Sequence, residues 1–190
     1  MSVAFELIFK STMLGVEIMS ILECSFPNES LISNELKSAD FHDSYQLLSL
    51  ENDLDPLDIY LLMVSNTPQW INTLLSLRNK VVNVFGLIDV GRLGEINYAQ
   101  LTNKNNLIGQ KLDLFEIENF NKNEMVLILN DKHLDIKISI LKKVNSSKFD
   151  VIVSTIVHFH NGFGKIYMAL ISPFHKIVVK RLMKNIKAVV

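Results

Sequence analysis

Three histidines in the second half of the chain form the densest set of side chains able to do chemistry. His158 and His160 are two residues apart in an apolar run, so on a strand they point to the same face. The expected pairing places His133 and Asp135 beside them on the neighbouring strand. Such a group could bind a transition metal or transfer a proton. Because no established metal-ligand spacing is present, the simpler interpretation is a solvent-exposed sheet face without a metal.

A second polar set surrounds the junction between the last expected strand and the last expected helix. Asn161 is typical of a helix N-cap at this position. His175 lies two residues after Pro173, which has no N–H and therefore leaves a carbonyl of the preceding helical turn without its donor. In the structural interpretation, the His175 imidazole donates a hydrogen bond to the backbone there. In the alternative, His160, Tyr167 or His175 acts on a ligand as an acid–base group or orients a ligand carbonyl or carboxylate.

Established catalytic motifs give no support for an enzyme. Ser154 and Ser172 lack a Gly-x-Ser-x-Gly setting, and Cys24 has no histidine near it in the sequence. Gly91 and Gly94 alone do not make a phosphate-binding loop. We therefore assign no catalytic residue, metal or cofactor, and a non-enzymatic function is the better expectation.

Composition indicates one folded domain of ordinary size. The chain has 190 residues, is 48% hydrophobic and carries a net charge of −1, which excludes a disordered chain and gives no reason to expect nucleic acid. One cysteine cannot form an internal disulfide, and we expect a cytoplasmic protein. Charges interrupt the apolar residues 1–24, so neither a signal peptide nor a spanning helix is expected there. We expect this segment to be a loosely attached extension, followed by a single domain at 25–190.

Hydrophobic periodicity predicts the elements that must position these residues. Helix starts are expected at Asp55-Pro56 and Thr67-Pro68, the second helix running to Gly86, and residues 87–110 are expected to be mostly loop. Alternation predicts strands at 45–50, 111–118, 125–129, 134–141 and 149–159. The last helix, 163–187, has an apolar stripe, and Pro173 should kink or divide it near Leu170.

Strand register can be predicted from the same alternation. A two-residue turn at Asp131-Lys132 would set Leu129 opposite Leu134 and, in the next hairpin, Leu134 beside Val157. Both hairpins then collect their apolar residues on one face, which the last helix can cover. The predicted fold is therefore α+β, with an antiparallel sheet wrapped around a long C-terminal helix and two helices inserted after the first strand.

Several of these residues also resemble a known family. The run His160-Asn161, Gly164, Tyr167 and Pro173-Phe174-His175, together with helix 70–86 and His133-Leu134-Asp135, resembles the bacterial domain of unknown function 2867 family over residues 40–185. The resemblance implies a helix-grip fold like the START and birch-pollen-allergen domains, which hold hydrophobic ligands between a curved sheet and a long helix. That family has no established activity, and in other members the domain is sometimes joined to a nucleotide-binding reductase domain.

A cavity between the sheet and the last helix is the first candidate site. We expect it to be lined by Trp70, Leu134, Ile136, Val153, Thr155, Tyr167 and Phe174. The alternative is that these side chains simply fill a closed core. Three functions stay open: binding of a small hydrophobic or amphipathic molecule or lipid, a polyketide-cyclase-like enzyme, and an interaction module that partners another subunit or a reductase.

Charge is distributed unevenly along the chain. No acidic residue follows Asp150, while six lysines and arginines do. A basic amphipathic helix can attract anionic lipid headgroups, which would make the protein membrane-peripheral. Complementarity with the helix dipole, or pairing with the acidic first part of the chain, is the simpler explanation.

Overall fold

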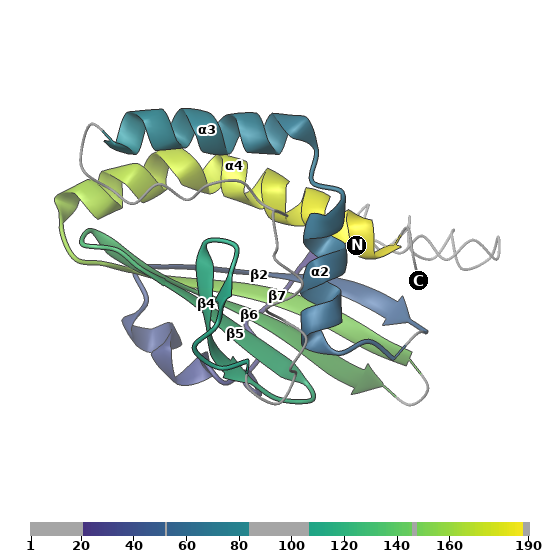
Figure 1. Ribbon diagram of the computed structural model, residues 1–190. Coiled ribbons are helices and arrows are strands. Elements are labelled where there is room, and N and C mark those ends of the chain that lie inside the picture. The colour runs from purple at the N-terminus through teal and green to yellow at the C-terminus, as the bar shows by residue number, and fades with distance from the viewer. Residues whose placement is uncertain (1–20, 52, 84–106, 146–147, 188–190) are drawn as a thin grey trace, which may run out of the picture.

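A seven-stranded antiparallel sheet forms the centre of the protein. The computed structural model describes residues 21–51, 53–83, 107–145 and 148–187. The strands are β1 (Ile21–Glu23), β2 (Phe41–Leu50), β3 (Lys111–Leu112), β4 (Phe115–Phe120), β5 (Glu124–Asn130), β6 (Leu134–Asn145) and β7 (Lys148–Phe159), in the spatial order β1-β2-β7-β6-β5-β4-β3. Three helices, α2 (Pro56–Ser65), α3 (Gln69–Asn83) and α4 (Gly162–Lys187), lie on one side of the sheet, and the short 3₁₀ helix η1 (Ser33–Ser38) lies on the other (Figure 1). The fold is α+β and helix-grip-like, as the sequence predicts.

The start of the sheet differs from the expectation in one respect. Residues 21–23, at the end of the expected extension, form β1 and pair with β2, so the two inserted helices follow the second strand. The predicted helix start at Pro56 is confirmed, because the Asp58 backbone N–H donates to the Asp55 side chain at 2.9 Å. The predicted loop 87–110, and the turn expected near Asn145-Ser146 between the last two strands, lie largely outside the described residues.

The predicted register is wrong by two residues, although the predicted face is right. Leu129 pairs with Ile136, because residues 131–133, and not a two-residue turn, join β5 and β6. In the next hairpin Ile136 pairs with Val157, and the pairing runs to Asn145 opposite Lys148. The Asp131 N–H closes this connection on the carbonyl of Leu134 at 3.0 Å. Side chains alternate along a strand, so an even shift keeps every apolar residue on the same side.

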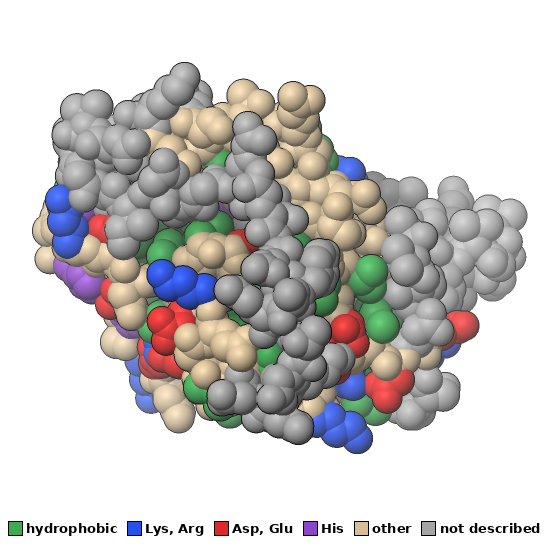
Figure 2. All heavy atoms as spheres, in the orientation of Figure 1, with side chains coloured by type: hydrophobic (Ala, Val, Ile, Leu, Met, Phe, Trp, Pro, Cys, Tyr) green, Lys and Arg blue, Asp and Glu red, His purple; other side chains and the backbone are tan. Residues whose placement is uncertain are grey.

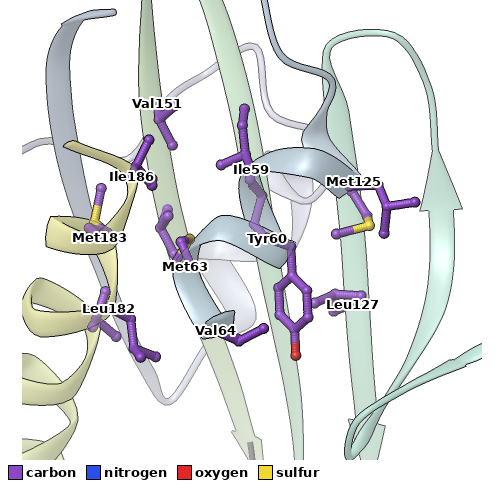
Figure 3. Packing of buried hydrophobic residues seen from close by; sticks show 14 of the residues in the cluster. Ile59, Tyr60, Met63, Val64, Met125, Leu127, Val151, Leu182, Met183 and Ile186 are labelled. Carbon is purple, nitrogen blue, oxygen red and sulfur yellow. The ribbon is translucent and has the colours of Figure 1, made fainter. Parts of the chain in front are cut away.

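The main hydrophobic core lies between this face and the helices. Figure 3 shows the buried side chains of α2 placed between those of the sheet and those at the end of α4. Asn185 fixes that end of α4 by donating its amide to the Met63 carbonyl of α2 at 2.7 Å. Each fully buried Leu, Ile or Met side chain stabilises the fold by about 1.5–3 kcal/mol relative to exposure. This core therefore holds α4 across the sheet.

Pro173 does not divide α4, which was one of the two outcomes expected from the sequence, and a kink near Leu170 stays a prediction. The helix runs without interruption from Gly162 to Lys187. Pro173 and Ala169, four residues before it, are both exposed, so the carbonyl that loses its helical donor can bind water.

Among the described residues, no helix is long and apolar enough to cross a bilayer.

Candidate ligand-binding site

Two adjoining cavities lie between the helices and the sheet. The first, of about 180 Å³, is lined by Ile71, Leu74, Leu75, Leu114, Leu129, Ile136, Tyr167, Ile171, Phe174, His175 and Val178. The second, of about 160 Å³, is lined by Tyr60, Met63, Val64, Leu75, Leu114, Phe115, Ile138, Ile140, Val153, Thr155, His175, Val178, Val179 and Leu182. In Figure 2, hydrophobic side chains gather in the recess between the helices and the sheet.

The local periods of helix and strand explain how these residues converge. Tyr167, Ile171, Phe174 and Val178 are four, three and four residues apart, so they form one face of α4. On the sheet, a lining residue such as Ile136 projects towards the helices because alternate side chains point to the same side. The two cavities share Leu75, Leu114, His175 and Val178. Of the lining residues in the described part of the chain, His175 is thus the one ionisable residue placed where the cavities meet.

A small polar cluster surrounds His175. Its Nε2 atom lies 3.2 Å from Thr155 Oγ1 and 3.4 Å from Asp43 Oδ1. Asp43 and Thr155 are paired across β2 and β7, and both are buried. Tyr45, two residues along the same face of β2, donates its hydroxyl to Asp43 Oδ2 at 3.2 Å. The ring of Phe41 packs edge-on against the imidazole. The sheet and α4 therefore bring a carboxylate, a hydroxyl and an imidazole together between them.

This cluster is not fully satisfied. Asp43 Oδ1 is buried and accepts no hydrogen bond within the described part of the chain, its nearest polar contact being His175 Nε2 at 3.4 Å. Burial, and then the neighbouring Asp43 carboxylate, raise the pKa of Tyr45, which keeps its hydroxyl a hydrogen-bond donor. Buried polar groups are normally saturated, so an under-satisfied carboxylate beside a cavity indicates a functional site.

The residues expected to line the cavity are divided among several environments. Ile136, Tyr167 and Phe174 line the first cavity, and Val153 and Thr155 line the second. Leu134 packs instead with Val157 and Met168 in a separate cluster. Trp70 lines neither cavity and is 42% exposed, because it precedes the face of α3 that turns inwards at Ile71.

The histidine cluster resolves into separate contacts. His160 Nε2 lies 2.9 Å from Asp135 Oδ2, and His160 lines neither cavity. His158 Nδ1 contacts the Ser38 carbonyl at 3.1 Å, and His133 Nδ1 contacts the Asn161 side chain. Within residues 21–187 as far as they are described, no three His, Cys, Asp or Glu side chains are grouped to hold a metal ion.

The sequence suggested that this face of the sheet is solvent-exposed, but a segment of the chain covers part of it. Residues 26–39, which we call the strap, cross it, and Ile32 of the strap is buried against Val126 and Ile156. His158 is half-buried beneath the strap, at its contact with Ser38. The strap was missed because its polar residues and turn formers are typical of a loop.

The motif residues at the start of α4 are structural. The side-chain oxygen of Asn161 accepts from the backbone N–H groups of Phe163 and Gly164 at 3.1 and 3.2 Å, so the predicted N-cap is confirmed. At Gly164, any Cβ would overlap the carbonyl oxygen of His133, so only glycine allows α4 to approach the β5–β6 connection so closely.

His175 corrects the structural interpretation made from the sequence. Its imidazole contacts the Thr155 and Asp43 side chains, and not the backbone beside Pro173. Asp43 was missed because the strand was predicted to begin at Tyr45, whereas β2 begins at Phe41. The available signal was alternation, since Asp43, Tyr45 and Leu47 occupy successive inward positions.

The sheet, the long covering helix and the two apolar cavities define a helix-grip-like α+β protein with ligand-sized space in its core. The chain belongs to the family described as protein of unknown function (DUF2867), whose family model matches residues 35–182. Searches of curated proteins and of solved structures found no match. The matched region contains Asp43, Tyr45, Thr155 and His175 of the polar cluster. The family description states no function, so the function must be argued from the site itself.

Proposed function

We propose that the protein binds a small, mostly apolar molecule in the two cavities between the sheet and α4. The observation that carries the proposal is the pair of adjoining voids of about 180 and 160 Å³. Native cores leave few voids larger than a water molecule, and an engineered apolar cavity of about 150 Å³ binds benzene. The resemblance to START and birch-pollen-allergen domains, which hold hydrophobic ligands in the corresponding place, supports the proposal.

The size of the cavities limits the ligand. Each is somewhat larger than the cavity that binds benzene, so a compound of two or three rings, or a chain of about eight carbons, would occupy both. Removing about 200 Å² of apolar ligand surface from water contributes roughly 5 kcal/mol before the costs of association. This energy corresponds to a dissociation constant of about 0.2 mM before those costs, so we expect dissociation constants between submillimolar and millimolar values.

The polar cluster would orient such a ligand. His175 and Thr155 both line the second cavity, so a hydroxyl or carbonyl group of the ligand can lie against them. Asp43 lies behind the imidazole, 3.4 Å from Nε2, and would fix the ring orientation. The expected ligand is therefore amphipathic, with one polar group at the junction of the cavities.

Titration with the fluorescent apolar compound N-phenyl-1-naphthylamine tests the binding. Ile171→Trp, which places a larger side chain in the first cavity, should abolish binding. Phe174→Ala should weaken it by about fivefold, the equivalent of roughly 1 kcal/mol of lost contact. Trp70→Ala is the matched control, since Trp70 is a similarly exposed aromatic residue of the helical layer that lines neither cavity. Wild-type affinity in a folded Ile171→Trp variant would refute the proposal.

Native mass spectrometry of the protein isolated from its own cells would identify the ligand class. A co-purified lipid or metabolite that is lost in Ile171→Trp would be the expected result. A molecule retained equally in both proteins would lie outside these cavities.

An acid–base enzyme of the polyketide-cyclase kind is the second candidate. The observation that favours it is the contact of His175 with Asp43, because a carboxylate that orients an imidazole is the arrangement used for proton transfer. Once a ligand is identified, His175→Gln should weaken its binding by about fivefold, because the imidazole no longer orients its polar group, while removing any conversion. Conversion that persists in His175→Gln would exclude this residue as the acid–base group.

A further inference from the structure

The outer side of α4 carries a stripe of exposed apolar side chains. Ile166, Leu170, Phe174 and Ile177 are 64%, 67%, 50% and 57% exposed. Their spacing of four, four and three residues places them along one side of the helix, away from its buried face. Contiguous exposed apolar residues of this kind mark an interaction surface. We refer to these four residues as the outer stripe.

Basic residues accompany the outer stripe. Exposed Lys165 and Lys176 follow one edge of it at helical spacing, whereas the ammonium of Lys180 lies 5.1 Å from the centre of the Tyr45 ring. The segments of α3 and α4 together contain eight lysines and arginines and no acidic residue, whereas the rest of the chain holds all 20 Asp and Glu. Lys176 lies 3.6 Å from Glu23 of β1. Helices α3 and α4 thus combine exposed apolar side chains with a single sign of charge.

We propose that the outer stripe docks on the surface of a membrane that contains anionic lipids. Apolar side chains along one side of a basic helix enter the boundary between headgroups and acyl chains, and the lysines meet the lipid phosphates. A second copy of this chain fits less well. A symmetric interface would bring the lysines of two acid-free helices together, and like charges repel.

Docking would also give the cavity a direct route to the bilayer. Phe174 belongs to the outer stripe and lines the first cavity, so the two features meet at this residue. An apolar ligand could then pass between membrane and cavity without crossing water. This route rests on the proposed ligand-binding function, whereas docking itself does not.

Vesicle flotation with the full chain tests the docking. Vesicles of 70% phosphatidylcholine and 30% phosphatidylglycerol should bind the protein at least tenfold more strongly than pure phosphatidylcholine, and salt should weaken binding. Leu170→Glu and Ile177→Glu, at stripe positions that line neither cavity, should each lower binding at least tenfold. Lys165→Glu with Lys176→Glu should act on the anionic vesicles alone. Val144→Glu is the matched control, because Val144 of β6 is 60% exposed and lies outside α4.

Each outcome separates docking from ligand binding. A wild-type protein that ignores anionic vesicles, or an Ile177→Glu variant that binds them unchanged, overturns docking even if N-phenyl-1-naphthylamine still binds. Docking that is lost in Ile177→Glu supports this proposal even if the probe never binds, in which case only the cavity function fails. If light scattering shows a dimer that Ile177→Glu dissociates while vesicles have no effect, a second copy covers the stripe and the membrane proposal is wrong.

Discussion

The two faces of the sheet both bury polar side chains, but they satisfy them differently. On the strap face, Ser44, Ser154 and Ser139 form a row across β2, β7 and β6, and all three are buried. Buried Glu124 lies at the end of this row, where it accepts from Ser139 Oγ and from Ser30 Oγ, both at 2.6 Å. The backbone N–H of Leu31 donates to both oxygens of the same carboxylate. This network joins the strap to the sheet with its carboxylate oxygens fully engaged.

On the helix face, the sequence neighbours of these serines, such as Asp43 beside Ser44 and Thr155 beside Ser154, form the adjacent row. There Asp43 pairs with Thr155, and one carboxylate oxygen receives the Tyr45 hydroxyl while the other accepts no hydrogen bond in the described part of the chain. Cavities adjoin this cluster, whereas the strap closes over the serine row.

Under the proposed ligand-binding function, we interpret the difference as that between a carboxylate that stabilises the fold and one that a ligand can complete. A saturated buried network stabilises one arrangement of the chain, because each donor lost leaves a partner unsatisfied. An under-satisfied buried group lowers stability and persists where a ligand can complete it. Matched substitutions should therefore mainly lower stability on the strap face and mainly change binding on the helix face.

Glu124→Gln should give the largest loss of stability. The amide keeps one acceptor oxygen and places an NH₂ group against donors such as the Leu31 N–H. We expect the free energy of unfolding to fall by about 2–3 kcal/mol, measured by urea denaturation. Glu116→Gln, an exposed carboxylate of β4, is the control and should change stability by less than about 0.5 kcal/mol. Equal effects of the two variants would contradict a structural role for the network.

Alkaline pH should destabilise the helix face through its buried tyrosines. Burial, followed by Asp43, raises the pKa of Tyr45, and burial with Asp113 raises the pKa of Tyr60. The folded state keeps these protons while the unfolded tyrosine loses them above its ordinary pKa of about 10, so stability is present below that pH and lost as pH rises.

Tyr45→Phe removes one of these two contributions. Between pH 9 and 11, its free energy of unfolding should fall by about 1.4 kcal/mol less than that of the wild type. Tyr60→Phe should have a similar effect. The phenolate absorbance due to Tyr45, taken as the difference between the wild type and Tyr45→Phe, should rise only with unfolding. A Tyr45 that titrates in the folded protein near its ordinary pKa would show that the cluster is open to water.

Lys137 tests the strap face with a smaller effect. Burial opposes its charge, but hydrogen bonds to Glu35 of η1 and Glu118 of β4 raise the pKa of the Lys137 ammonium. The contribution of Lys137 to stability is therefore fully present below the ordinary lysine pKa of about 10.4, and it is lost as the pH rises through the higher pKa of the folded state. Lys137→Met should cost about 0.5–1 kcal/mol at neutral pH, and less in high salt. A cost that salt leaves unchanged would indicate packing, and not charge.

Local signals were enough to predict much of the fold. Asp55-Pro56 predicted the start of α2, Asn161 the cap of α4, and strand alternation the apolar face. Long-range features could not be predicted in the same way. Glu124 accepts a hydrogen bond from Ser30, which is 94 residues earlier in the chain. The register between β5 and β6 depends on the length of the connection that joins these two strands. The Asp43 contact with His175 depends likewise on which elements pack together.

Asp43→Asn should give the smallest loss of stability and the clearest change in binding. The amide oxygen can still accept from Tyr45, and the substitution removes a buried charge that has one unsatisfied oxygen, so we expect a change within about 0.5 kcal/mol. The imidazole of His175 would lose the charge that orients it. Affinity for 1-naphthol should therefore fall by about fivefold while affinity for naphthalene stays unchanged, both measured by fluorescence titration. A loss of stability as large as that of Glu124→Gln would contradict this interpretation. It would show that Asp43 is needed for folding, so its burial would not require a ligand as the explanation.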